Sequence, residues 1–138
     1  MTTFPKEKEK RQYRRLPAIS LSADLKVKKG LFTHWLSANA LDFNIYGVAL
    51  VLPNEPILGT KTKLKLSLTM DMAEVKVSQI EAKVVNKMML DSKKGEWRAG
   101  FIFANQSKHS EETTKQLKRI SNYLERNNLL KEKLKDGE

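Results

Sequence analysis

A strict alternation of apolar and polar residues is the feature that most constrains the fold of this chain. From Ile19 to Lys28 every second residue is apolar, and the residues between are serine, aspartate or lysine. Residues 61–70 repeat the pattern with leucine and methionine as the apolar residues. Side chains of a strand point alternately to its two faces, so a period of two indicates a strand with one buried face. The chain is therefore expected to form a sheet with one apolar side.

Turns and shorter apolar runs divide the neighbouring sequence into further strands. These strands are predicted at residues 31–41, 48–52, 75–88 and 97–103. Lys29–Gly30 and Asp91–Gly95 are typical of turns, and the prolines and glycine of residues 53–59 indicate a loop. Between Val77 and Ile80 the apolar residues change parity, which predicts a β-bulge or sharp bend. About six short antiparallel strands favour a small barrel or a sandwich.

The C-terminal segment has the pattern of one amphipathic helix. Ser110 is a suitable N-cap, and the two glutamates after it suit the positive end of a helix dipole. Apolar residues then recur at helical spacing, at Leu117, Ile120 and Leu124. The pattern fades after Leu130, so residues 131–138 are expected to fray. The helix is expected to cover an open end of the sheet or to carry an interface.

Composition narrows the classes of function. The 138 residues fit one domain with a formal net charge of +10, a charge that favours an anionic nucleotide, nucleic acid or membrane surface. There is no cysteine, and two histidines make a histidine-rich metal site a poor candidate. We find no nucleophile–base constellation and no phosphate-binding glycine loop, so no enzymatic activity is expected. Without a membrane span or a signal peptide, we expect a cytoplasmic protein.

Four cations lie within six residues near the N-terminus, in the stretch Lys10-Arg11-Gln12-Tyr13-Arg14-Arg15. Guanidinium groups are planar forks of donors that match phosphate oxygens and the O6/N7 edge of guanine. A flexible arm that carries Arg11 and Arg15 can close over an anionic, guanine-containing ligand. A solvated basic tail is the simpler interpretation of the charge run alone.

A second polar cluster consists of Asp42, Asn44 and Gly47, which are predicted to lie between strands. The Asp42 carboxylate can accept hydrogen bonds from the N1–H and N2–H₂ groups of guanine, and Asn44 can read a base edge. Gly47 permits a positive φ or a close approach of backbones. An ordinary turn is the simpler interpretation of the cluster by itself, because these residue types favour turns.

Together the two clusters resemble the signature of the PilZ domain family, RxxxR in an N-terminal arm followed by [D/N]xSxxG after the second strand. The resemblance spans the arm, the six-strand pattern, the glycine-bearing strand at 97–103 and the terminal helix. Members are receptors for the bacterial second messenger cyclic di-GMP. The resemblance implies an all-β fold, a six-stranded antiparallel β-barrel with a C-terminal α-helix. It divides the chain into a flexible basic arm (1–16), a barrel (17–107) and a helix with its tail (108–138).

The resemblance also implies roles for single residues. Arg11 and Arg15 would hold the phosphates and the Hoogsteen edges of the guanines. Asp42 and Asn44 would contact a guanine, while Gly47 would shape the loop. The family usually has serine at the position of Asn44, so the asparagine either preserves recognition with a small shift or crowds the base.

Three further cations are additional candidates for contact with the ligand. Arg14 can add a phosphate contact, and Arg98 can reach the bound nucleotide from the last strand. Lys10 precedes the first arginine, at a position that the family links to the number of nucleotides bound, and a cation there favours a stacked pair. No cofactor is expected beyond the ligand itself.

The sequence thus predicts a cyclic di-GMP receptor whose arm changes conformation on binding and which signals to an unidentified protein target. One alternative is a degenerate PilZ scaffold that has lost the ligand and acts through protein contacts. A basic nucleic-acid-binding β-barrel is less favoured, because the regularly spaced exposed aromatics of stacking platforms are missing. A monomer and a homodimer are both compatible with the sequence. Trp35 and Trp97 are expected in the core or at the barrel rim, and Met88–Leu90 in the core rather than on a docking surface.

Overall fold

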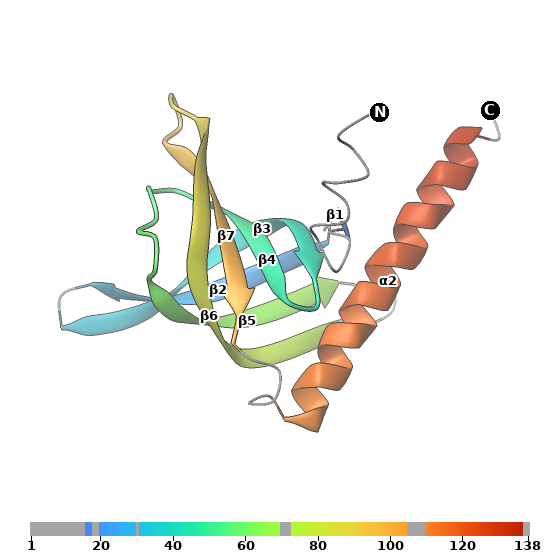
Figure 1. Cartoon of the computed structure of the whole chain (residues 1–138), viewed down its shortest axis with the longest axis horizontal. Helices are drawn as coiled ribbons and strands as arrows, with labels where there is room; N and C mark the ends of the chain where they lie inside the picture. The colour runs from blue at the N-terminus through green and yellow to red at the C-terminus, as the bar shows by residue number, and fades with distance from the viewer. Residues whose placement is uncertain (1–15, 18–19, 30, 70–72, 105–109, 137–138) are drawn as a thin grey trace, which may run out of the picture.

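The structure, a computed structural model, describes residues 16–17, 20–29, 31–69, 73–104 and 110–136. These described residues form seven strands and one helix (Figure 1). Their bounds are β1 Leu16–Pro17, β2 Leu21–Lys29, β3 Phe32–Asn44, β4 Gly47–Leu52, β5 Lys61–Thr69, β6 Glu74–Asp91, β7 Glu96–Phe103 and α2 Glu111–Asp136.

The strands form one antiparallel sheet that closes on itself. Their order is β1-β3-β2-β5-β6-β7-β4, and an additional β3–β4 pairing joins β4 back to β3. Strands β2 to β7 therefore make a six-stranded barrel, and the short β1 is an extra strand beside β3. The predicted all-β barrel with a C-terminal helix is confirmed, with one strand more than the sequence indicated.

The predicted change of parity in β6 is a β-bulge. Leu64 of β5 pairs with Ile80, but Leu66 pairs with Val77, so two residues of β6 oppose one residue of β5. The bulge brings apolar residues on both sides of it to the same face, because Val77 and Ile80 are both buried. Bulges increase local bending, and β6 is a long, curved strand (Figure 1).

The core fills the barrel with the apolar face of each strand. Strand β2 contributes Leu21, Ala23 and Leu25 to the core, and β5 contributes Leu64, Leu66 and Leu68. The exposed side of both strands is polar or charged, as the period of two predicts. Burial of apolar surface is the main force that holds such a closed sheet together.

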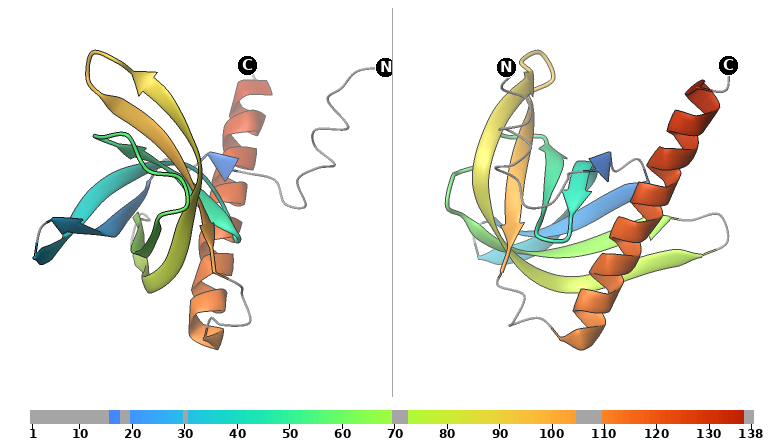
Figure 2. Two further views of the ribbon diagram at one scale, coloured as in Figure 1. Left: turned by 60° about the vertical axis from the view of Figure 1, so that its left-hand side comes forward. Right: turned by 45° about the vertical axis from the view of Figure 1, so that its right-hand side comes forward.

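Helix α2 completes the core. It begins after Ser110, whose Oγ accepts a hydrogen bond from Thr113 N at 3.1 Å, so the predicted N-cap is confirmed. Leu117, Ile120 and Leu124 join the barrel core, and the helix lies against β6 and β1 (Figure 2). The prediction that residues 131–138 fray is wrong for residues 131–136, which continue the helix. No helix in the described residues is long and apolar enough to cross a membrane.

Three sequence expectations about the outer surface need correction or refinement. Strand β3 runs to Asn44 and not to residue 41, so Asp42 and Asn44 lie within a strand. Trp35 is half-buried on the outer face of the barrel, with Lys65 Nζ 4.1 Å from its ring centroid, so it is not a core residue. The segment Met88–Leu90 is exposed, so its assignment to the core was wrong. Trp97 is half-buried on β7.

Candidate ligand-binding site

The polar cluster of the sequence lies on a tight hairpin between β3 and β4. Asp42 and Asn44 are near the end of β3, Gly47 is the first residue of β4, and Ile45–Tyr46 form the turn. The register shifts between Ala40 and Asp42, where Ala40 pairs with Leu50 and Asp42 with Ala49. This bulge changes which residues of β3 face the core, so that Phe43 is buried and its neighbours Asp42 and Asn44 are only half-buried.

Asn44 holds the turn together through its side chain. Its Oδ1 accepts hydrogen bonds from Tyr46 N at 2.7 Å and Gly47 N at 3.0 Å. This is the local side-chain-to-backbone bonding that makes asparagine a turn residue. The oxygen of Asn44 therefore faces the turn, and its bonds fix where the hairpin places Asp42.

Gly47 is required by a close approach of backbones. A Cβ atom at this position would overlap the carbonyl oxygen of Phe101 on β7. The approach is held by a hydrogen bond from Phe103 N to Tyr46 O at 2.7 Å. The sequence suggested either a positive φ or a close approach of backbones at Gly47. The close approach applies, since φ is not positive at Gly47.

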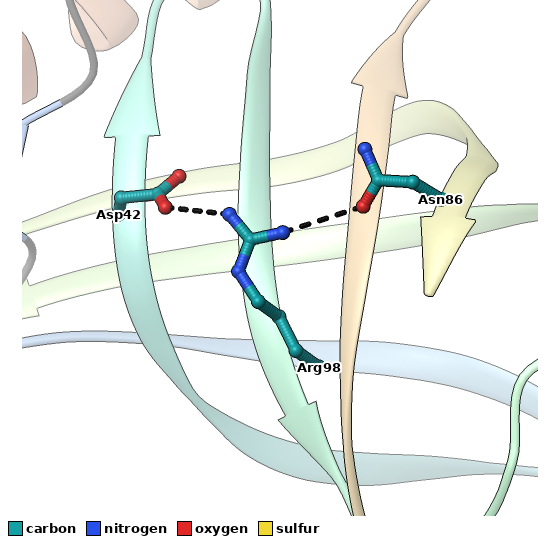
Figure 3. A network of polar contacts seen from close by, with 3 residues as sticks. All are labelled: Asp42, Asn86 and Arg98. Atoms are coloured by element: carbon teal, nitrogen blue, oxygen red, sulfur yellow. Dashed lines mark hydrogen bonds and ion pairs between the residues drawn. The ribbon is translucent and has the colours of Figure 1, made fainter. Parts of the chain in front are cut away.

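A polar network joins Asp42 to two strands across the barrel surface (Figure 3). The Arg98 guanidinium on β7 donates from Nη2 to Asp42 Oδ2 at 2.8 Å and from Nη1 to Asn86 Oδ1 at 3.3 Å. The side chains of Arg98 and Asp42 are only 21% and 23% exposed. A charge-assisted bond in such a partly buried place is stronger than one on an open surface, and it orients the carboxylate.

Asn86 is a member of this network that the sequence analysis missed. It pairs with Gly100 on β7, and a Cβ atom at Gly100 would overlap the Asn86 amide. The glycine therefore lets the amide lie over β7 and reach Arg98. The signal in the sequence was a polar residue that follows the apolar pair Val84–Val85, but its direction depends on a register shift between Val84 and Asn86.

The four cations of the basic arm, Lys10, Arg11, Arg14 and Arg15, lie outside the described residues. The structure does place the residues that follow them. Leu16 pairs with Phe43 and Pro17 pairs with Asp42, so β1 lies beside the end of β3. Leu16, the residue that follows Arg15 in the sequence, thus pairs with the strand that carries Asp42 and Asn44.

The arrangement offers donors and acceptors for hydrogen bonds. The oriented carboxylate and the asparagine amide lie on β3, and the Arg98 guanidinium reaches the carboxylate from β7, the strand on the other side of β4. A carboxylate accepts paired N–H donors and a guanidinium donates to anionic oxygens, which suits a polar planar base joined to a phosphate. In the part of the chain that the structure describes, no group of three or more histidine, aspartate or glutamate side chains could hold a metal ion.

Comparison with solved structures identifies the type of fold. The chain is similar to the PilZ domain of YcgR from Escherichia coli, solved with c-di-GMP, with a TM-score of 0.59 and 21% identity over 89% of this chain and 97% of that chain. It is similar to YcgR from Escherichia coli in complex with c-di-GMP, with a TM-score of 0.65 and 20% identity over 93% of this chain and 50% of that chain. The PlzA protein of Borreliella burgdorferi, also in complex with c-di-GMP, matches with a TM-score of 0.54 and 12% identity over 99% of this chain and 57% of that chain.

These likenesses show that the chain has the fold of a PilZ domain, as the sequence resemblance predicted. The chain spans about half the length of the YcgR and PlzA chains that it matches. No protein-family model and no curated protein matches the sequence.

Proposed function

We propose that this protein is a receptor for cyclic di-GMP that acts by binding, without catalysis. The similar PilZ-fold structures of YcgR and PlzA contain c-di-GMP, which supports this ligand class. In the proposal, Arg11 and Arg15 bind phosphates and guanine edges, while Asp42 receives the N–H donors of a guanine. The bound arm then offers a changed surface to a protein target.

The observation that carries the proposal is the pairing of β1 with the end of β3. The two halves of the motif are separated by about thirty residues of sequence, but Pro17 pairs with Asp42 and Leu16 with Phe43. Consecutive Cα atoms are about 3.8 Å apart, so Arg15 is attached one residue from this pairing. Arg11 is five residues from Leu16 and within roughly 18 Å of it along the chain. Both arginines can therefore reach a ligand that sits against Asp42.

Asn44 fits the proposed role despite the serine that is usual at its position. Its oxygen is used by the backbone N–H groups of Tyr46 and Gly47, so the side chain folds toward the turn. In this conformation it supports the hairpin in the way that a serine hydroxyl can, with the amide group as an added donor. We infer that Asn44 positions Asp42 and leaves room for the base.

A receptor is also favoured over a barrel that binds single-stranded nucleic acid. Such barrels stack bases on open aromatic faces. The ring of Trp35, on the outer face, is covered by Lys65 Nζ at 4.1 Å. The cation–π contact occupies the surface on which a base would stack.

Calorimetric titration with cyclic di-GMP tests the proposal. We expect saturable binding by the parent protein and a loss of roughly tenfold to a thousandfold in affinity for Arg15→Ala, because a charge-assisted phosphate contact disappears. Lys94→Ala is the matched control, since it removes an exposed cation from the β6–β7 turn and should leave affinity unchanged. The number of nucleotides bound per chain tests the prediction drawn from Lys10.

Two outcomes would contradict the receptor. Absence of binding at tens of micromolar ligand would reject it, and equal losses for Arg15→Ala and Lys94→Ala would show only a general effect of charge. If the parent does not bind and Asn44→Ser does, the protein would instead be a scaffold that has lost its ligand and acts through protein contacts.

A further inference from the structure

The outer half of the β2–β3 hairpin is a two-stranded ribbon that projects from the barrel (Figure 1). The pairing of β2 with β5 extends only from Leu21 to Leu25, whereas its pairing with β3 continues to Lys29 and Phe32. We call residues 26–29 and 31–35 the β2–β3 ribbon. Its base is fixed by a hydrogen bond from Thr62 Oγ1 to Lys26 O at 2.6 Å and by the contact of Lys65 with Trp35. The ribbon is thus anchored to the barrel at its base.

Two large apolar side chains are exposed at the tip of this ribbon. Leu31 is 95% exposed and Phe32 is 77% exposed. Neither contributes to the core of the barrel. Exposure of adjacent apolar side chains to water is unfavourable, and together on a projection they indicate a binding surface.

The charge of the same segment defines the kind of partner. Between Asp24 and Asp42 the sequence has no acidic residue and three lysines, at positions 26, 28 and 29. The side chains of Lys26 and Lys28 are exposed, and they lie behind the apolar tip along the ribbon. Apolar residues in front of cations match the interface of an anionic bilayer, where acyl chains lie beneath phosphate groups.

A second apolar loop lies at the same end of the barrel. Ile57 and Leu58 in the β4–β5 loop are exposed, and both views in Figure 2 place this loop, like the ribbon, away from α2. The acid of this loop, Glu55, forms an ion pair with Lys87 at 2.5 Å, which offsets its charge. Exposed apolar side chains on a hairpin and on a loop suit insertion at the headgroup boundary of a bilayer.

We propose that the β2–β3 ribbon, assisted by the β4–β5 loop, docks this protein on anionic lipid membranes. Leu31 and Phe32 enter the boundary of the acyl chains, and the lysines of the ribbon lie at the lipid phosphates. This proposal does not depend on the proposed binding of cyclic di-GMP, because the ribbon and the Asp42 cluster lie at opposite ends of β3.

Cosedimentation with vesicles tests this docking. The full chain is mixed with vesicles of equal parts phosphatidylglycerol and phosphatidylcholine, and with vesicles of phosphatidylcholine alone. We expect binding only to the anionic vesicles, a decrease with added salt, and a loss of at least about tenfold for Leu31→Ser/Phe32→Ser. Leu129→Ser is the matched control, because it removes an exposed apolar side chain from α2 and should bind as the parent does.

Unchanged circular dichroism of the double variant is the expected sign that the barrel is intact. Three results would overturn the proposal: no binding of the parent to anionic vesicles, equal binding to neutral vesicles, or equal binding of the parent and Leu31→Ser/Phe32→Ser. The first of these, with the tip still exposed, would direct attention to an acidic protein as the partner of the ribbon.

Discussion

The two ends of β3 are built in opposite ways. At the end that leads into β4, Phe43 is fully buried, and Asp42 and Asn44 are held by bonds to Arg98 and to the turn. At the other end, Phe32 is 77% exposed, and the first residues of β3, from Phe32 to Ser37, pair with β2 alone among the described strands. One strand of 13 residues therefore joins a tightly packed hairpin to a projecting one.

The difference corresponds to the two kinds of contact that we propose. Recognition of a nucleotide needs donors and acceptors fixed within tenths of an ångström, and packed strands with a polar network supply that. Docking on a fluid bilayer needs exposed apolar side chains and nearby cations, with little demand on exact geometry. Substitutions along β3 should accordingly have large effects on stability at one end and small ones at the other.

Removal of equal side chains from the two ends gives the largest expected contrast. Phe43→Ala should lower the free energy of unfolding by roughly 3–5 kcal/mol, because it leaves a cavity in the core. Phe32→Ala should change it by less than about 0.5 kcal/mol, since its ring is exposed. Urea denaturation of both variants measures the two values. Similar losses would mean that the ribbon tip is packed in solution and would remove the contrast between the two ends.

A methyl group at Gly47 should give the next largest effect. In Gly47→Ala the new Cβ meets the carbonyl oxygen of Phe101, so β4 and β7 must separate locally. We expect a loss of about 2–3 kcal/mol in the free energy of unfolding, the upper part of the range for overpacked sites, because the new atom meets backbone. Thermal denaturation measures the loss. An unchanged midpoint would show that the two strands approach less closely than described.

The ion pair between Arg98 and Asp42 should have a smaller effect on stability. Each side chain is about a fifth exposed, so we expect Arg98→Met to cost about 1–2 kcal/mol. A double-mutant cycle with Asp42→Asn should show coupling, because the two residues share one bond. If Arg98 orients Asp42 for the ligand, cyclic di-GMP affinity should fall in Arg98→Met without a change in stoichiometry. Additive effects in the cycle would contradict this role.

The sequence predicts the parts of the fold that depend on local pattern. The alternation that begins at Ile19, the parity change near Val77 and the cap at Ser110 each determine structure within a few residues. The first is confirmed from Leu21 to Lys28, since Ile19 lies outside the described residues, and the other two are confirmed as well. The extension of α2 to Asp136 was missed because the apolar spacing ends earlier, although lysine, glutamate and leucine are good helix formers.

The candidate site was only partly predictable, because its contacts depend on register between distant strands. Asp42 was identified by its residue type, but its bond to Arg98 spans 56 positions of sequence. That bond requires β7 to be aligned with β4 and β4 with β3, including the bulge between Ala40 and Asp42. Asn86 lies beyond a second bulge, so its direction could not be inferred from the alternation. The roles of Arg11 and Arg15 stay predictions.

The smallest expected effect concerns the side chain that closes the packed hairpin. Asn44→Ala removes the acceptor of two backbone N–H groups and should cost about 1 kcal/mol in the free energy of unfolding. Asn44→Ser keeps an acceptor on a shorter side chain and should lower the free energy of unfolding by only a few tenths of about 1 kcal/mol. Cyclic di-GMP affinity should follow the same order, with the serine variant close to the parent. A serine variant as weak as the alanine variant would show that the amide itself contacts the base, and Asn44 would then be a direct ligand rather than a support for Asp42.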